Sequence, residues 1–136
     1  MGTWGPGTLE NDTAVDWMYG LGEVGDFSLI EGTLDRALAC GNDWLEAADA
    51  EEGIAAAEAV ARLLGNFGVR GDYTRPMDDW VSWMTERPSL ELLTKARLIV
   101  IRVQQAPSEL LELWTKSEAA ETWSRSLRDL SIRLGA

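Results

Sequence analysis

Oxygen ligands suited to a hard cation are concentrated near the N-terminus of this 136-residue chain, in Glu10, Asn11, Asp12 and Asp16. Mg²⁺ and Ca²⁺ bind such carboxylate and amide oxygens. The spacing lacks the alternating ligands and final glutamate of a calcium loop, and it favours capping and dipole-complementing side chains at a helix start. A divalent-metal site, or a metal-dependent hydrolase, using Glu10, Asp12 and Asp16 is therefore the alternative function.

Other catalytic patterns are missing from the sequence. The chain has no histidine, which removes the commonest general base at neutral pH and most transition-metal sites. Cys40 is the only cysteine, so no intrachain disulfide and no multi-cysteine zinc site can form. The neighbours Glu51 and Glu52, like Asp78 and Asp79, would point to different sides of a helix rather than toward one substrate. We therefore expect no catalytic residue and no cofactor.

Tryptophan is abundant, and most of the seven indoles should pack in a core. The residues are Trp4, Trp17, Trp44, Trp80, Trp83, Trp114 and Trp123. Trp80 and Trp83 follow the glycine-containing segment 65–76, which is predicted to be the longest loop, and function is often carried by loops of this kind. Because indoles are favoured at interfaces, Trp80 and Trp83 are the predicted partner-binding residues.

The charge is distributed unevenly along the chain. Residues 1–60 hold 13 acidic side chains and one basic side chain, a net charge of −12, whereas residues 61–136 hold 11 basic and 10 acidic side chains. Nucleic-acid phosphates would be repelled by the acidic half, which excludes nucleic acid as the expected partner. We expect a non-enzymatic binding protein, of the inhibitor or immunity type, whose partner is a basic protein.

Apolar residues recur at helical spacing along most of the chain. The expected helices cover residues 13–20, 28–41, 49–65, 77–85, 89–105, a segment after Pro107, and a last segment through 123–134. Glycines surround Trp4, so residues 2–7 should form an irregular segment. We predict an all-α fold for residues 1–136, a single compact domain of five to seven helices with an irregular, glycine-rich N-terminal segment.

Two details of these helices are also predicted. Ser28 and Glu31 have the spacing of a capping box at the start of the second helix. The helix at 89–105 is expected to be the most buried, because Leu92, Ile99 and Val103 line it at helical spacing.

No apolar run reaches the roughly 20 residues that cross a bilayer, so no membrane association is expected. The first residues lack both the basic region and the apolar stretch of a secretory signal, and we expect a cytoplasmic protein.

The opening residues carry a resemblance to a known family. From Gly2 to Trp17 the chain reads GTWGPGTLENDTAVDW, in which Trp4, Asn11, Asp12, Asp16 and Trp17 occupy the positions of a G-x-W-G-x-G-x-x-x-N-D-x-A-x-D-W signature. This signature resembles that of a family of small bacterial proteins classed as domain of unknown function 4259, followed there by an alanine-rich helix and a tail containing leucine and tryptophan. Leu9 replaces the aromatic residue usual at its position. The resemblance implies a bacterial, cytoplasmic protein, and it implies no activity. We interpret the signature as structural.

Overall fold

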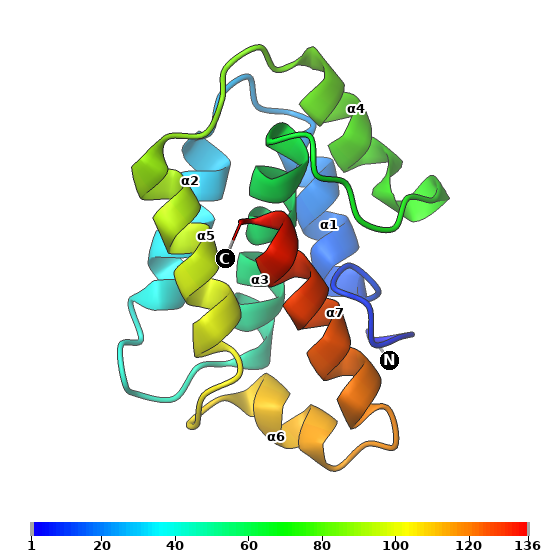
Figure 1. Cartoon of the computed structure of the whole chain (residues 1–136), viewed down its shortest axis with the longest axis vertical. Helices are drawn as coiled ribbons and strands as arrows, with labels where there is room; N and C mark the ends of the chain where they lie inside the picture. The colour runs from blue at the N-terminus through cyan, green and yellow to red at the C-terminus, as the bar shows by residue number, and fades with distance from the viewer. Residues whose placement is uncertain (1, 136) are drawn as a thin grey trace.

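Seven α-helices and one short 3₁₀ helix are formed by residues 2–135, the part of the chain that the computed structural model describes. This confirms the all-α class and the expected five to seven α-helices (Figure 1). The elements in chain order are α1 (Asp12–Leu21), α2 (Ser28–Leu38), α3 (Ala47–Leu63), η1 (Asp72–Thr74), α4 (Arg75–Trp83), α5 (Leu90–Arg102), α6 (Glu109–Thr115) and α7 (Ala120–Arg133).

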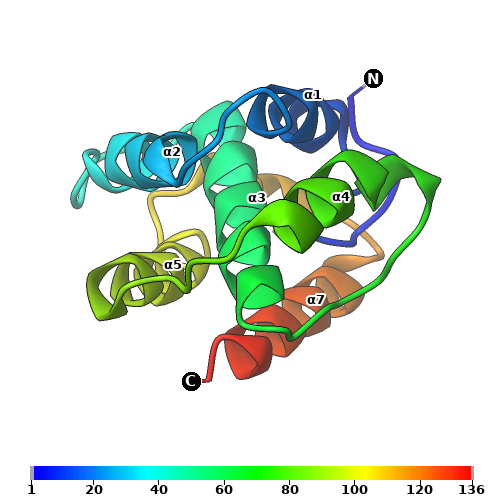
Figure 2. The same cartoon turned by 90° about the horizontal axis from the view of Figure 1, so that it is seen from above.

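Helix α3 is the centre of the array, and Figure 2 shows the other long helices arranged around it. It contacts α1, α2, α4, α5, α6 and α7. Its short alanine side chains let these neighbours approach closely, and alanine also has the highest intrinsic helix propensity. At Gly53 an added Cβ would lie 2.8 Å from Ile99 of α5 and 3.2 Å from Ala37 of α2. Glycine is therefore required where α2, α3 and α5 meet.

The prediction that the helix at 89–105 is the most buried is wrong. Every residue from 53 to 62 of α3 is buried, whereas α5 exposes Leu90, Leu98 and Ile101. The apolar positions of α5 cover more of its circumference than the core can contact. Size is the physical reason for the error, because small alanines fit at the centre of a helix array while large aliphatic side chains suit its periphery.

Polar side chains cap three of the helix starts. Asn11 Oδ1 accepts from the backbone N–H of Ala14 at 2.7 Å. Ser89 and Ser108 likewise accept from backbone N–H groups at the starts of α5 and α6. Each cap satisfies one of the donors that a helix N-terminus leaves free.

Other predicted starts are corrected. Ser28 is the first residue of α2, not its cap, because both its backbone N–H and its hydroxyl donate to Asp26 Oδ1. The capping box with Glu31 is therefore absent. Helix α3 begins at Ala47, two residues before the predicted Asp49, and the backbone N–H of Ala47 donates to Glu109 of α6 at 2.7 Å.

Helix α4 also begins earlier than predicted. The predicted range was 77–85, but the helix covers Arg75–Trp83, with a proline in its first turn. Proline is tolerated there because a first-turn N–H has no intrahelical acceptor.

The helices are short relative to a bilayer. The longest, α3, has 17 residues, and a spanning helix needs about 20. Within residues 2–135, no helix combines the length and the apolar character needed to cross a membrane.

Candidate functional site

The outward face of α1 is acidic and carries an exposed aromatic ring. Asp12, Asp16 and Tyr19 are spaced four and three residues apart, which places them on one side of the helix, and all three are exposed. Tyr19 keeps 63% of its surface in contact with solvent. The opposite side enters the core through Ala14, Trp17, Met18 and Leu21. The charged face of α1 is therefore left without a covering element.

Helix α4 places a second exposed aromatic ring beside a carboxylate. Asp79 and Trp83 are one helical turn apart and both are exposed. Trp83 is 81% exposed, the highest fraction among the exposed large apolar side chains of the described residues. Trp80 is only 4% exposed, and its indole N–H donates to the carbonyl of Val24 at 2.8 Å. Of the two tryptophans predicted to bind a partner, Trp83 is accessible and Trp80 is a core residue.

Helix α4 packs against α1, so the two exposed faces belong to neighbouring helices (Figure 1). Near the start of both helices, the Trp4 ring packs edge-on against Tyr73 with centroids 5.1 Å apart, and its N–H donates to Asp12 at 3.2 Å. Near their ends, Gly22 and Trp83 line one small pocket. The helices therefore run in the same direction. We call the exposed residues of these two neighbouring helices, with Glu23 just after α1, the α1–α4 surface: Asp12, Asp16, Tyr19, Glu23, Asp79 and Trp83.

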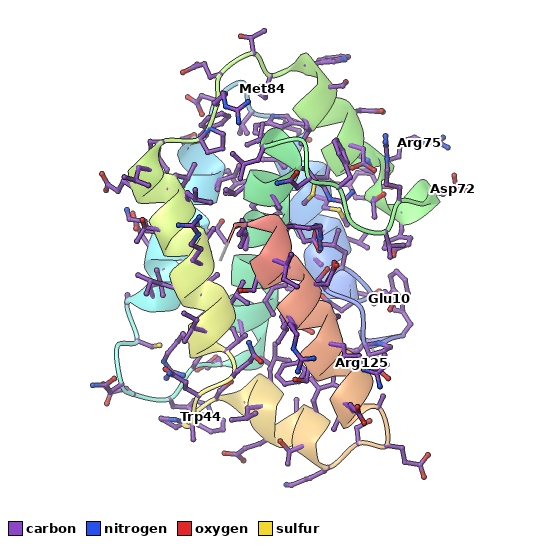
Figure 3. All side chains as sticks on the ribbon, in the orientation of Figure 1. Glu10, Trp44, Asp72, Arg75, Met84 and Arg125 are labelled. Atoms are coloured by element: carbon purple, nitrogen blue, oxygen red, sulfur yellow. The ribbon has the colours of Figure 1, made fainter. Side chains whose placement is uncertain are left out.

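The carboxylates of this surface keep their charge unneutralised. Within residues 2–135, no ion pair involves Asp16, Glu23 or Asp79. At the edge of the surface, Asp72 is instead paired with Arg75 at 2.8 Å, and both are labelled in Figure 3. Exposed rings beside unpaired carboxylates are suited to binding a cationic surface, because a cation is attracted both to a carboxylate and to an aromatic face.

The proposed metal ligands are not brought together. Glu10 Oε1 accepts from the backbone N–H of Gly7 at 2.7 Å, Asp12 accepts from the Trp4 indole, and Asp16 lies on the exposed face of α1. Across residues 2–135, no three Asp, Glu or Cys side chains are grouped so that they could hold a metal ion.

The signature residues make local structural contacts. Asn11 caps α1, and Trp17 is buried with its indole N–H donating to the Thr33 hydroxyl at 2.8 Å. Trp4 joins the N-terminal segment to both Tyr73 and Asp12. The signature thus positions the start of α1 against η1, one end of the α1–α4 surface.

A buried ion network connects distant parts of the fold. Arg62 of α3 donates to Glu58 of the same helix at 3.3 Å and to Asp78 of α4 at 2.6 Å. Arg133 of α7 donates to both oxygens of Glu58, at 2.9 and 2.8 Å. The hydroxyl of Thr8 also donates to Glu58. Glu58 and Arg62 are each only 1% exposed. The network therefore fixes the N-terminal segment, α3, α4 and α7 to one another.

The charges in this network are mutually compensated. Burial acts to raise the pKa of Glu58, but hydrogen bonds from Arg133, the charges of Arg133 and Arg62, and the Thr8 hydroxyl outweigh it and hold that pKa below its ordinary value. Burial likewise acts to lower the pKa of Arg133, and Glu58 and Asp129 outweigh it, so that pKa is raised. In residues 2–135 every buried side-chain nitrogen and oxygen has a hydrogen-bond partner. The network is complete without a substrate or a ligand.

A pocket of about 340 Å³ lies over this network. Glu10 from the N-terminal segment and Arg125 from α7 both line it and are labelled in Figure 3. Its charged groups already have partners: Glu10 accepts from Gly7, Arg125 pairs with Glu121, and Asp129 pairs with Arg133. Because these charged groups already pair within the protein, the α1–α4 surface is the stronger candidate site.

The sequence contained a partial signal for the buried network. Glu58 and Arg62 are charged residues one turn apart inside an otherwise apolar stretch of α3, and buried charges are normally paired. Nothing in the spacing identified Asp78 as their partner. Arg133 lies near the end of the chain, 75 residues from Glu58, and its side chain is only 12% exposed.

The chain also matches a known protein family. Residues 2–126 match the family model described as domain of unknown function (DUF4259). The chain belongs to this family. The match confirms the expected family, and its range includes Glu58, Arg62 and Asp78, whereas Arg133 lies beyond it. No curated protein and no solved structure matches the chain. The family description assigns no activity, so a function has to be inferred from the surface of this DUF4259 protein.

Proposed function

We propose that this DUF4259 protein is a non-enzymatic binding module that docks a basic protein on its α1–α4 surface, in the manner of an inhibitor or immunity-type protein. The observation that carries the proposal is the coincidence of exposed aromatic rings and unpaired carboxylates on two helices that pack together. Among the exposed large aromatic side chains, Trp4, Tyr19 and Trp83 lie along α1 and α4, while Trp44 lies elsewhere.

Aromatic and charged groups would have separate roles in such a complex. Rings such as Tyr19 and Trp83 lose little conformational entropy when they become ordered, so they provide contact area at the centre of an interface. Carboxylates such as Asp16, Glu23 and Asp79 attract a basic partner over long distances and raise the association rate. This attraction weakens as ionic strength rises, because the Debye length falls from about 10 Å at 0.1 M salt to about 3 Å at 1 M.

The lack of histidine and the pairing of the buried charges within residues 2–135 support a binding role. The chain has no histidine, and the buried charges form a network in which each group is already paired. The alternative function, metal binding by Glu10, Asp12 and Asp16, lacks support, because Glu10 and Asp12 accept from different donors and Asp16 lies on the exposed face of α1.

The proposal is tested by affinity capture from a lysate of the source organism at about 50 mM and 500 mM salt. Captured proteins would be compared for the wild-type chain and for a surface variant with three neutralised carboxylates, Asp16→Asn, Glu23→Gln and Asp79→Asn. The matched control removes three exposed carboxylates that also have no ion pair within residues 2–135: Asp43→Asn, Glu112→Gln and Glu118→Gln.

The proposal predicts a basic protein that is retained by the wild type and the control and is lost with the surface variant or at high salt. It would be contradicted if the same proteins were captured by all three chains, or if capture did not depend on salt.

A further inference from the structure

A small pocket lies where α1 ends beside α4. Its walls are Gly22 at the end of α1, and Pro76, Asp79, Trp80 and Trp83 of α4. Its volume is about 140 Å³, well below the roughly 300–1,000 Å³ of pockets that enclose drug-sized ligands. A pocket of this size is suited to a single side chain.

One wall of the pocket is rigid and the other is free to adapt. Trp80 is held by its hydrogen bond to the Val24 carbonyl and by the ring of Phe27, whose centroid lies 6.1 Å away. Trp83, one turn further along α4, is 81% exposed. A flat group entering the pocket could therefore stack on the exposed indole of Trp83, while Trp80, only 4% exposed, forms part of the fixed wall.

Three independent features of the pocket favour a positive charge. The C-terminal end of α1 carries the partial negative charge of the helix dipole, and its last turn contains no basic residue that would offset it. Asp79 is exposed and forms no ion pair with any residue between 2 and 135. The exposed indole face of Trp83 attracts cations through the ring quadrupole.

We propose that this pocket binds one arginine side chain of the basic partner, an inference that rests on the proposed function and deepens it. The guanidinium is planar, so it can stack on an indole while its N–H groups donate to Asp79. Its aliphatic stem would lie against Pro76. The pocket therefore provides a specific anchor within a surface whose other carboxylates act mainly at long range.

The test uses nuclear magnetic resonance of the full ¹⁵N-labelled chain. The probe is the peptide acetyl-Gly-Ser-Arg-Ser-Gly-amide, and its control is the same peptide with citrulline, which has the shape of arginine but no charge. The arginine peptide should shift the Gly22 amide and the Trp83 indole N–H resonances in a saturable way. The citrulline peptide should produce no saturable shift.

Variants then locate the contact. Asp79→Asn should weaken binding of the arginine peptide roughly three- to tenfold, the range expected for one charge-assisted hydrogen bond. Asp43→Asn, a distant exposed carboxylate, should leave the affinity unchanged. Gly22 has φ −62°, a conformation open to other residues, so Gly22→Leu should fill the pocket and abolish binding. If Gly22→Leu alters resonances throughout the protein, the affinities of the surface variants Asp79→Asn and Trp83→Ala for the arginine peptide provide the test instead.

The inference is overturned if citrulline binds as well as arginine, if Asp79→Asn and Trp83→Ala have no effect, or if the shifts occur away from Gly22 and Trp83. Its failure is distinguishable from failure of the proposed function. A captured basic partner that is lost with the carboxylate variant but retained by Gly22→Leu would overturn the arginine pocket and leave the proposed function supported. A partner whose capture neither variant reduces would contradict the proposed function. The peptide titration would still show whether the pocket binds arginine.

Discussion

Arg133 of α7 donates hydrogen bonds to both carboxylate oxygens of Glu58 in α3, at 2.9 and 2.8 Å, although 75 residues separate them in the sequence. Because Glu58 also accepts from Arg62 and Thr8, this pair is the point at which the ends of the chain are joined to the central helix. It thereby supports the arrangement on which the α1–α4 surface depends.

Replacing Glu58 with glutamine should destabilise the fold severely. The change leaves Arg62 and Arg133 without their shared negative partner, and breaking a buried pair in this way typically costs about 3–5 kcal/mol of unfolding free energy. Urea denaturation followed by tryptophan fluorescence would measure the loss. The matched control is Asp129→Asn, which removes an exposed partner of Arg133 and should cost under about 1 kcal/mol. Equal effects of the two substitutions would contradict a structural role for the network.

The lowered pKa of Glu58 predicts how the stability of the fold depends on pH. Since the pKa of Glu58 is lower in the folded chain than in the unfolded chain, its contribution is present above the unfolded value of about 4.3 and is lost as pH falls through the folded pKa. The difference in unfolding free energy between the wild type and Glu58→Gln should therefore be constant from pH 7 to 5 and shrink below about pH 4. A difference that stays constant down to pH 3 would refute the assigned shift.

The contribution of Glu51 to folding stability should depend on pH in the opposite direction. Burial, with a smaller contribution from the charge of Glu109, raises its pKa, while hydrogen bonds from Thr13 and Thr3 only partly offset this. An acid whose pKa is raised on folding disfavours the folded state when ionised, and this penalty disappears as pH falls below the unfolded pKa.

Glu51→Gln should accordingly raise the melting temperature at pH 7 and have little effect near pH 4. The control is Glu52→Gln, because Glu52 pairs with Arg36 at 3.1 Å on the exposed side, and its loss should slightly lower the melting temperature. Thermal unfolding at both pH values provides the measurement, and a lower melting temperature for Glu51→Gln at pH 7 would count against the prediction.

The positions of most helices could be predicted from the sequence because local interactions determine them. Asn11, Ser89 and Ser108 supply caps within three residues of the groups they satisfy. The prediction at Ser28 failed for an equally local reason, since Asp26 competes for the same serine. A short-range hydrogen bond can thus be predicted from the spacing of residues, unless a second polar side chain nearby competes for the same group.

The candidate site could be predicted only in part. The position of Trp80 and Trp83 after the predicted loop identified α4 as a place for exposed indoles, but only tertiary packing determines which of them is buried. The network of Glu58, Asp78 and Arg133 could not be predicted, because its members meet through tertiary packing and not through sequence spacing.

The two tryptophans of α4 should therefore separate binding from stability. Trp80→Ala removes a buried ring and its hydrogen bond, and should cost about 3–5 kcal/mol of unfolding free energy. Trp83→Ala removes an exposed ring, and should change stability by no more than about 0.5 kcal/mol while weakening partner binding. Denaturation curves and binding isotherms on the same samples provide the test. A Trp83→Ala chain that binds its partner with unchanged affinity would show that this ring is not part of the interface.

The most direct test of the central claim is the rate at which the captured partner associates with the protein, measured by surface plasmon resonance as a function of ionic strength. The wild type and the control (Asp43→Asn, Glu112→Gln, Glu118→Gln) should show an association rate that falls steeply with salt, because carboxylates of the α1–α4 surface attract the partner. The surface variant (Asp16→Asn, Glu23→Gln, Asp79→Asn) should associate more slowly at low salt and depend less on salt. Equal salt dependence of the surface and control variants would contradict docking on this surface.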